Sequence, residues 1–148
     1  MRYSDKLTAV EDTIAAHQDV AKRKGAVWLG KMGKTLSWQH INTLNEQCQD
    51  GVPTYVFLVQ KHRHDYEVYQ GNVIEVSRVC PEDRRLIPPY YEEQGIIRYI
   101  RLWQKLTAIR KLDAAALKRL HIASSGSSAA ETLPHSMAAL FLVRQRSS

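Results

Sequence analysis

The sequence predicts an α+β fold, a small and strongly curved mixed β-barrel with flanking helices. Three segments support this prediction. Residues 25–60 read in the order strand, turn, helix, turn, strand. Within them, residues 54–59 (Thr-Tyr-Val-Phe-Leu-Val) have the β-branched and aromatic composition typical of a strand. The apolar residues 138–144 read as a buried strand, which we expect to pair with an earlier strand and close the barrel.

The length and composition fit one globular domain. A chain of 148 residues, 44% of them hydrophobic, is long enough to bury a core. We expect an amphipathic helix over 1–24, a barrel domain over 25–144 and a frayed tail over 145–148. No segment approaches the roughly 18 apolar residues that a membrane span needs. With no apolar signal core at the N-terminus, we expect a cytoplasmic protein that does not bind a membrane.

The two cysteines and the charge pattern narrow the class further. Cys48 and Cys80 are too few for a disulfide framework and lack a metal-ligand spacing, so we expect both to be reduced. The net charge is +6, and residues 101–148 hold eight Lys or Arg against two acidic residues. This segregation is typical of a surface that faces a polyanion. A surface that merely keeps the protein soluble would give the same pattern.

Three helices are expected. Residues 4–24 carry apolar side chains at three- and four-residue intervals, and Gly25 is a natural end for that helix. Ser37 is the expected N-cap of a second helix of about twelve residues. A short third helix is expected over 112–120, with Asp113 as its N-cap.

The remaining strands are less regular. Residues 26–30 form the expected first strand. Strand residues over 66–76 surround Gly71, which marks either a tight turn or a bulge. Residues 80–95 contain three prolines and two adjacent tyrosines and read as a long loop, a kind of segment that is often functional. Residues 96–106 alternate as a long strand with large side chains on both faces.

One face of the 96–106 strand interleaves cations with aromatic rings. Tyr99, Arg101, Trp103 and Lys105 alternate there, a pattern that suits the phosphates and bases of a nucleic acid. A strand that bridges core and surface explains the same pattern equally well.

Trp38, in the first turn of the second helix, can belong to a pocket, although aromatic residues at helical spacing more often pack into the core.

Motifs for catalysis are missing from the sequence. Neither a GxGxxG motif, a P-loop nor a GxSxG elbow occurs. His62 and His64 have a two-ligand spacing without a third ligand nearby, so we expect an exposed hairpin tip and no metal. We therefore expect a binding protein with no catalytic residue and no cofactor. An enzyme that acts on nucleic acid or nucleotides is a further hypothesis, in which His62, His64 and Asp65 would form the catalytic cluster.

The order of elements resembles the PUA-like superfamily and, within it, the EVE and YTH domains. Those domains are small curved barrels with a helix between the first two strands. The matching segments are 27–30 as first strand, 37–49 as helix and 54–59 as second strand, while 100–120 is similar to the strand and helix before their last strand. The resemblance covers roughly residues 26–143, and the N-terminal helix is an addition to the pattern.

This resemblance implies a reader of modified bases in DNA, or alternatively RNA, that flips a base into an aromatic cage. The implied base-binding pocket consists of Trp28, Trp38, Tyr55 and Trp103. The implied phosphate-binding residues are Lys31, Lys34, Arg101, Lys105, Arg110, Lys111, Lys118 and Arg119. Such domains often accompany a nuclease or NTPase, as partner or fused domain, in restriction or antiviral defence. The alternative is a protein-interaction or regulatory domain with no nucleic-acid ligand.

Overall fold

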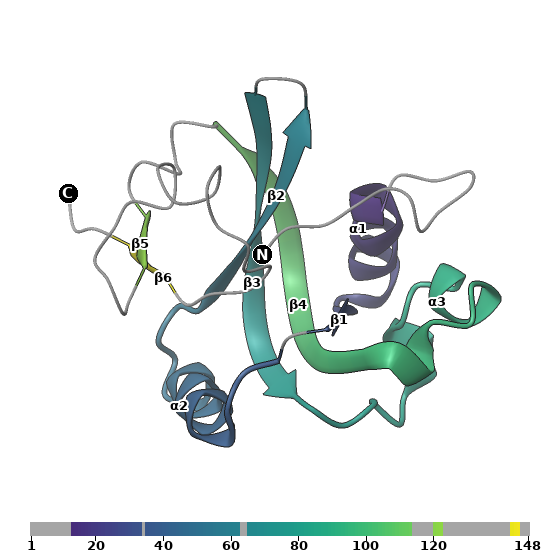
Figure 1. The fold of residues 1–148 in the computed structure, drawn as a ribbon, viewed down its shortest axis with the longest axis horizontal. Helices are drawn as coiled ribbons and strands as arrows, with labels where there is room; N and C mark the ends of the chain where they lie inside the picture. Colours follow the sequence, from purple (N-terminus) through teal and green to yellow (C-terminus); the bar gives the residue numbers. More distant parts are fainter. Residues whose placement is uncertain (1–12, 34, 63–64, 114–119, 123–142, 146–148) are drawn as a thin grey trace.

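A computed structural model describes residues 13–33, 35–62, 65–113, 120–122 and 143–145 (Figure 1). In chain order these residues form α1 (Thr13–Lys24), β1 (Val27–Met32), α2 (Trp38–Gln49), β2 (Tyr55–His62), β3 (Asp65–Ser77), η2 (Arg84–Leu86), α3 (Tyr90–Glu93), η3 (Ile97–Tyr99), β4 (Ile100–Leu112), β5 (Leu120–Ile122) and β6 (Val143–Gln145). No helix in this part of the chain is long and apolar enough to cross a membrane.

Four strands make one antiparallel sheet in the order β1-β4-β3-β2. The α+β class is therefore confirmed. The closed, mixed barrel is wrong, because the described sheet is open and antiparallel throughout, with β1 and β2 at its edges. Of the expected closing strand 138–144, residues 143–144 belong to β6, which pairs with β5 in a separate two-stranded sheet. Residues 138–142 lie outside the described part.

The curvature of the sheet comes from irregular pairing in its two long strands. Both β3 and β4 have 13 residues, and both bend strongly in Figure 1. The register between them shifts at Gly71/Val73 and again at Val73/Glu75, so β3 is one bulged strand rather than two strands joined by a turn. A Cβ at Gly71 would lie 2.9 Å from a methyl carbon of Leu106, so a larger residue here would force the buried Leu106 side chain to shift.

Helix α2 covers the edge of β3 beyond the end of β2. The β2 pairing reaches only Asn72. Beyond it, the Asn45 side chain donates from Nδ2 to the Val76 carbonyl at 2.9 Å and accepts from the Val76 N–H at 2.8 Å. The Cys48 thiol lies 3.3 Å from the Val73 carbonyl oxygen. The helix thus satisfies backbone groups that a further strand would need for closure.

The buried side chains form two clusters. The first joins α1 and α2 to one face of the sheet and contains Ile14, Val20, Ile41, Leu58, Leu102 and Leu106. The second joins α1 to β1, the start of β4 and the α3 region, and contains Ala16, Trp28, Ile87, Tyr90, Tyr91, Ile96, Ile100 and Trp103. These two clusters pack against the bent sheet and fix the positions of the elements around its bend.

The expected helices and strands are found with shifted ends. Ser37 caps α2 as predicted, because its hydroxyl accepts a backbone N–H in the first turn. Of the expected helix 4–24, the structure describes α1, and residues 4–12 lie outside the described part. The predicted 96–106 strand begins at Ile100 and runs to Leu112, so the start of the predicted helix 112–120 is wrong. Residues 114–119 lie outside the described part. The expected loop 80–95 contains η2 and α3.

Candidate nucleic-acid interface

The turn between β1 and α2 is held against the start of β4. Gly33 has φ +81°, a left-handed conformation that favours glycine. The Lys31 side chain is buried and donates from Nζ to the Met32 carbonyl at 2.9 Å. Thr35 donates from its hydroxyl to the backbone carbonyl of Arg101 at 3.1 Å. These bonds fix the path of the chain into α2 and bring the turn next to Arg101.

Trp38, the first residue of α2, has an exposed indole ring that lies beside a fixed arginine. The side chain is 56% exposed. The guanidinium carbon of Arg78 lies 4.9 Å from the ring centroid. Arg78 is itself held, since its Nε and Nη2 donate to the Leu36 carbonyl at 3.0 and 2.6 Å. An exposed aromatic ring next to a cation is the chemistry of a base-stacking platform.

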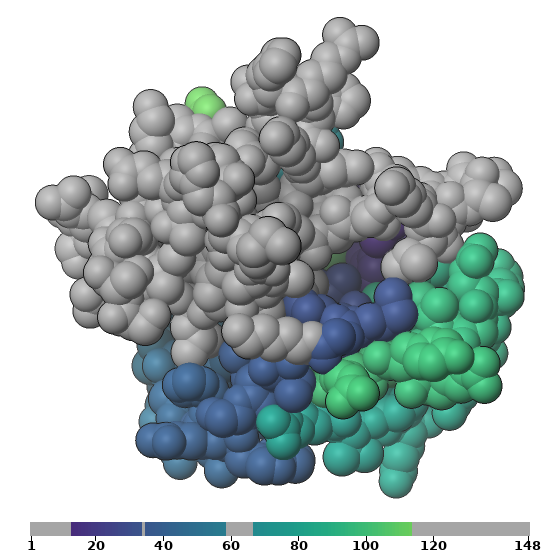
Figure 2. Space-filling view, in the orientation of Figure 1, coloured from purple at the N-terminus to yellow at the C-terminus, as the bar shows by residue number. Residues whose placement is uncertain are grey.

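Arg101 extends this surface onto β4. The pairing passes from Lys31 opposite Leu102 to Met32 opposite Ile100, so Arg101 is the extra residue of a bulge and its side chain is exposed. It makes no ion pair among the described residues. Figure 2 shows the blue residues of the turn and α2 directly against the green residues of β4 on one face. We call Trp38, Arg78 and Arg101 the Trp38 surface.

The four aromatic residues expected in the base pocket do not come together. Trp28 is 5% exposed and Trp103 is fully buried in the second cluster, where the Trp103 ring stacks on Tyr91 at 5.8 Å between centroids. Trp38 and Tyr55 are exposed, but Trp38 is the first residue of α2, whereas Tyr55 begins β2, six residues after α2 ends at Gln49. The structure therefore offers two separate exposed aromatic sites and a buried tryptophan pair.

Tyr55 belongs to a second aromatic and basic surface on the sheet. Its ring centroid lies 6.3 Å from that of Phe57, on the strand face opposite the buried Val56. Phe57 pairs with Gln70, which pairs with Arg110, so Arg110 stands in the same row about 10 Å away. We call Tyr55, Phe57 and Arg110 the Tyr55 surface.

The cations expected to bind phosphate are spread over several environments. Arg101, Arg110 and Lys111 have exposed side chains on β4. Lys105 is half-buried, with its Nζ 5.8 Å from the centroid of the Trp28 ring. Lys31 is buried, as described above, and Lys34, Lys118 and Arg119 lie outside the described part. Arg78, which the sequence analysis missed, directly follows the end of β3, a strand-end position typical of exposed cations.

A buried chain of hydrogen bonds joins α1, α3 and β1 in the core, and the sequence analysis did not predict it. His17 Nδ1 lies 2.7 Å from the Thr13 carbonyl, which can only accept, so Nδ1 carries the proton. His17 Nε2 then accepts from the Tyr91 hydroxyl at 2.8 Å, and the Tyr91 oxygen accepts from the Gly30 N–H at 2.9 Å. Burial lowers the pKa of His17 to about 4 and raises the pKa of Tyr91. Both groups are therefore neutral at pH 7. In the sequence, only the helical spacing of His17 in the predicted N-terminal helix pointed to a buried side chain.

Within the described ranges, no group of three or more His, Cys, Asp or Glu residues could hold a metal ion. The enzyme hypothesis places its catalytic cluster at His62, His64 and Asp65, and His64 lies outside these ranges. The absence of a catalytic residue stays a prediction.

Comparison with known proteins gives one match. A family model described as Pua-like matches residues 1–135, which include every described element except β6. No curated protein and no solved structure matches the chain. Pua-like domains are generally binding modules, and such a domain suggests binding of RNA, DNA or a modified base.

Proposed function

Because the chain belongs to the Pua-like family, we propose that it binds DNA and reads a modified base flipped out of its strand. The observation that carries this proposal is the exposed indole of Trp38 beside the Arg78 guanidinium. Flipping a base costs a few kcal/mol of stacking and pairing. Stacking on an aromatic ring returns about 1–3 kcal/mol. The Trp38 surface thus offsets the cost of holding one extruded base.

The neighbouring cations position the strand. Arg101 is exposed on β4, and its backbone carbonyl accepts a hydrogen bond from Thr35, three residues before Trp38. Its side chain contacts phosphate, which fixes the register without reading sequence. The Tyr55 surface begins on β2, which follows the end of α2 opposite Trp38 in the chain. It serves as a second stacking contact for the same strand. Trp28 and Trp103 support this arrangement from the core rather than touch the base.

The narrower proposal is an EVE- or YTH-type specificity module of a DNA-defence or restriction system. It rests on the element order of residues 26–143 and on the absence of catalytic motifs from the sequence. A nuclease or NTPase, as partner or fused domain, would supply the chemistry that follows recognition.

The test is fluorescence anisotropy of labelled oligonucleotides at about 0.15 M salt. Unmodified duplex DNA is compared with duplexes that carry methylcytosine, hydroxymethylcytosine or methyladenine, and with RNA of the same sequence. We expect one modified duplex to bind most tightly. Trp38→Ala should weaken that binding about 5- to 150-fold, since a stacked base contributes about 1–3 kcal/mol.

The matched control is Val52→Ala, which removes an exposed apolar side chain beyond the other end of α2. It should leave the affinity unchanged. Equal affinity for all duplexes, unaffected by Trp38→Ala, would reduce the protein to a backbone binder. Tighter binding of RNA would move the ligand to that class. No binding of any oligonucleotide would favour the protein-interaction alternative.

A further inference from the structure

A cavity of about 680 Å³ opens beside α3, and none of its lining residues belongs to the two surfaces described above. Its lining comes from residues 80–100, of which 80–95 were predicted as a loop and 96–100 as the start of a strand. The lining residues are Cys80, Arg84, Tyr91, Glu92, Gly95, Ile97, Arg98 and Ile100. The volume is typical of small-molecule sites, which span about 300–1,000 Å³.

The inner wall of the cavity is apolar and rigid. Ile100 and Tyr91 are buried members of the second cluster, and Ile97 packs against that cluster. Tyr91 is further fixed by its hydrogen bonds to His17 and to the Gly30 N–H. Tyr91 and Ile100 are buried, so the half-buried Ile97 in front of them offers the apolar surface on which a planar group can lie without rearrangement.

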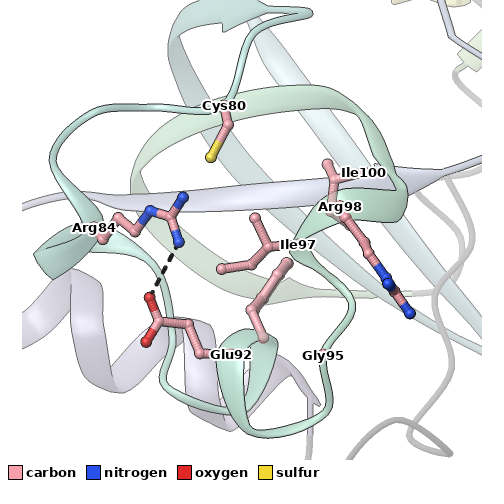
Figure 3. A pocket seen from close by; sticks show the side chains of 8 residues that line it. Cys80, Arg84, Glu92, Gly95, Ile97, Arg98 and Ile100 are labelled. Carbon is pink, nitrogen blue, oxygen red and sulfur yellow. Dashed lines mark hydrogen bonds and ion pairs between the residues drawn. The ribbon is translucent and has the colours of Figure 1, made fainter.

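The rim of the cavity carries charge. Figure 3 places the Arg84–Glu92 pair and Arg98 on opposite sides, with Ile97 between them and the Cys80 sulfur facing the same space. Arg84 Nη1 is 3.5 Å from Glu92 Oε1, a long contact between two exposed side chains, so Arg84 can change partner at little cost. Arg98 lies over Tyr99 at 4.8 Å and makes no ion pair within the described residues.

We propose that this cavity binds a nucleoside phosphate, either a free nucleotide or the phosphorylated end of a strand. The base lies on Ile97, which packs against the buried cluster of Ile100 and Tyr91. Arg84 and Arg98 bind the phosphate, for which the planar guanidinium is suited. The Glu92 carboxylate accepts a hydrogen bond from a ribose hydroxyl or a ring N–H. This inference stands apart from the proposed function, because none of these residues belongs to the Trp38 surface.

Alkylation of the two cysteines by iodoacetamide, followed by mass spectrometry, tests the proposal. Cys80 lines the cavity, while Cys48 lies on α2 and serves as an internal reference. The probes are nucleoside 5′-monophosphates, the matching nucleosides and inorganic phosphate, each at about 1 mM. A Kd near 0.1 mM would slow the alkylation of Cys80 about tenfold and leave Cys48 unchanged. Nucleosides and phosphate alone should protect less.

Arg84→Gln and Arg98→Gln should each abolish most of the protection. Arg85→Gln is the matched control, since Arg85 neighbours Arg84 but is paired with Asp83 and does not line the cavity. Unchanged Cys80 rates with every probe would overturn the proposal, as would protection that survives both lining variants.

Two oligonucleotides identify the source of the phosphate. A strand with a 5′-phosphate that protects Cys80, where the 5′-hydroxyl strand does not, assigns the site to strand ends. Protection by mononucleotides alone assigns it to free nucleotides. The Trp38→Ala variant separates the two proposals, because it should leave mononucleotide protection intact whether or not the protein binds duplex DNA.

Discussion

His17 makes the buried hydrogen-bond chain dependent on pH. Its folded pKa is about 4, whereas the unfolded value is 6.5. The unfolded chain therefore binds more protons between these values, and stability falls as the pH drops from 6.5 to 4. Above pH 6.5 the contribution is constant, and below pH 4 no further loss occurs. The full loss amounts to about 3 kcal/mol.

Urea denaturation at pH 7 and pH 4.5 measures this effect. The free energy of unfolding of the wild type should fall by about 2–3 kcal/mol more than that of His17→Gln, whose side chain does not titrate. Subtracting the two profiles removes the carboxylates common to both proteins, such as Asp83, whose pKa is lowered by its hydrogen bonds to Arg85. Parallel profiles for the two proteins would mean that His17 is not held neutral in the fold.

The surroundings of single residues also explain which site residues could be predicted from the sequence. Trp38 and Arg101 stay predicted site residues. Both are exposed, and the turn before Trp38 meets the Arg101 backbone through Thr35, a contact between segments 66 residues apart that no local pattern indicates. Trp103 was expected on the face of Arg101, but the bulge at Arg101 changes the alternation and Trp103 is buried beside Ile100. A bulge depends on the partner strand, so no periodicity in the 96–106 segment could reveal it.

At the scale of elements, α2 replaces a strand at the edge of β3. Asn45→Ala would leave both the N–H and the carbonyl of Val76 without their side-chain partner. We expect a loss of about 1–3 kcal/mol in the free energy of unfolding, together with faster hydrogen exchange of the Val76 amide. Chemical denaturation and exchange measured by NMR check both expectations.

Thr43→Ala on the same helix is the control. The Thr43 hydroxyl donates only to a backbone carbonyl of its own helix, that of Gln39, and its side chain is exposed. It should change stability by a few tenths of a kcal/mol at most. An equal effect of the two substitutions would show that Asn45 contributes helix propensity alone and does not hold the strand edge.

The elements predicted best are those specified by nearby residues. The N-cap at Ser37 and the β-branched run that forms β2 place α2 and the strand after it. Barrel closure was predicted wrongly because it depends on which distant edge a strand meets. The edge of β3 after Asn72 is covered by α2, and β6 pairs with β5. Nothing local to residues 138–144 indicates that choice.

At the scale of the whole molecule, the charge excess of the last third appears on β4. Arg101, Arg110 and Lys111 are exposed along this one strand, and they connect the region of the Trp38 surface with that of the Tyr55 surface. A strand of nucleic acid that follows the face of Tyr55 and Phe57 would meet Arg110, whereas the adjacent Lys111 points to the opposite face of β4. The net charge of +6 then assists association over long range, and salt screens it.

The salt dependence of binding measures how many of these cations contact phosphate. The logarithm of the association constant should fall linearly with the logarithm of the salt concentration. Each phosphate contact contributes about −0.7 to −0.9 to the slope of this line. Arg101→Gln should therefore reduce the slope by about 1 while the preference for a modified base is kept. Arg23→Gln is the control, because Arg23 lies on α1 and is paired with Asp19 at 2.8 Å. Anisotropy titrations at four salt concentrations give the slopes, and a slope unchanged by Arg101→Gln would remove Arg101 from the interface even if Trp38 stays in it.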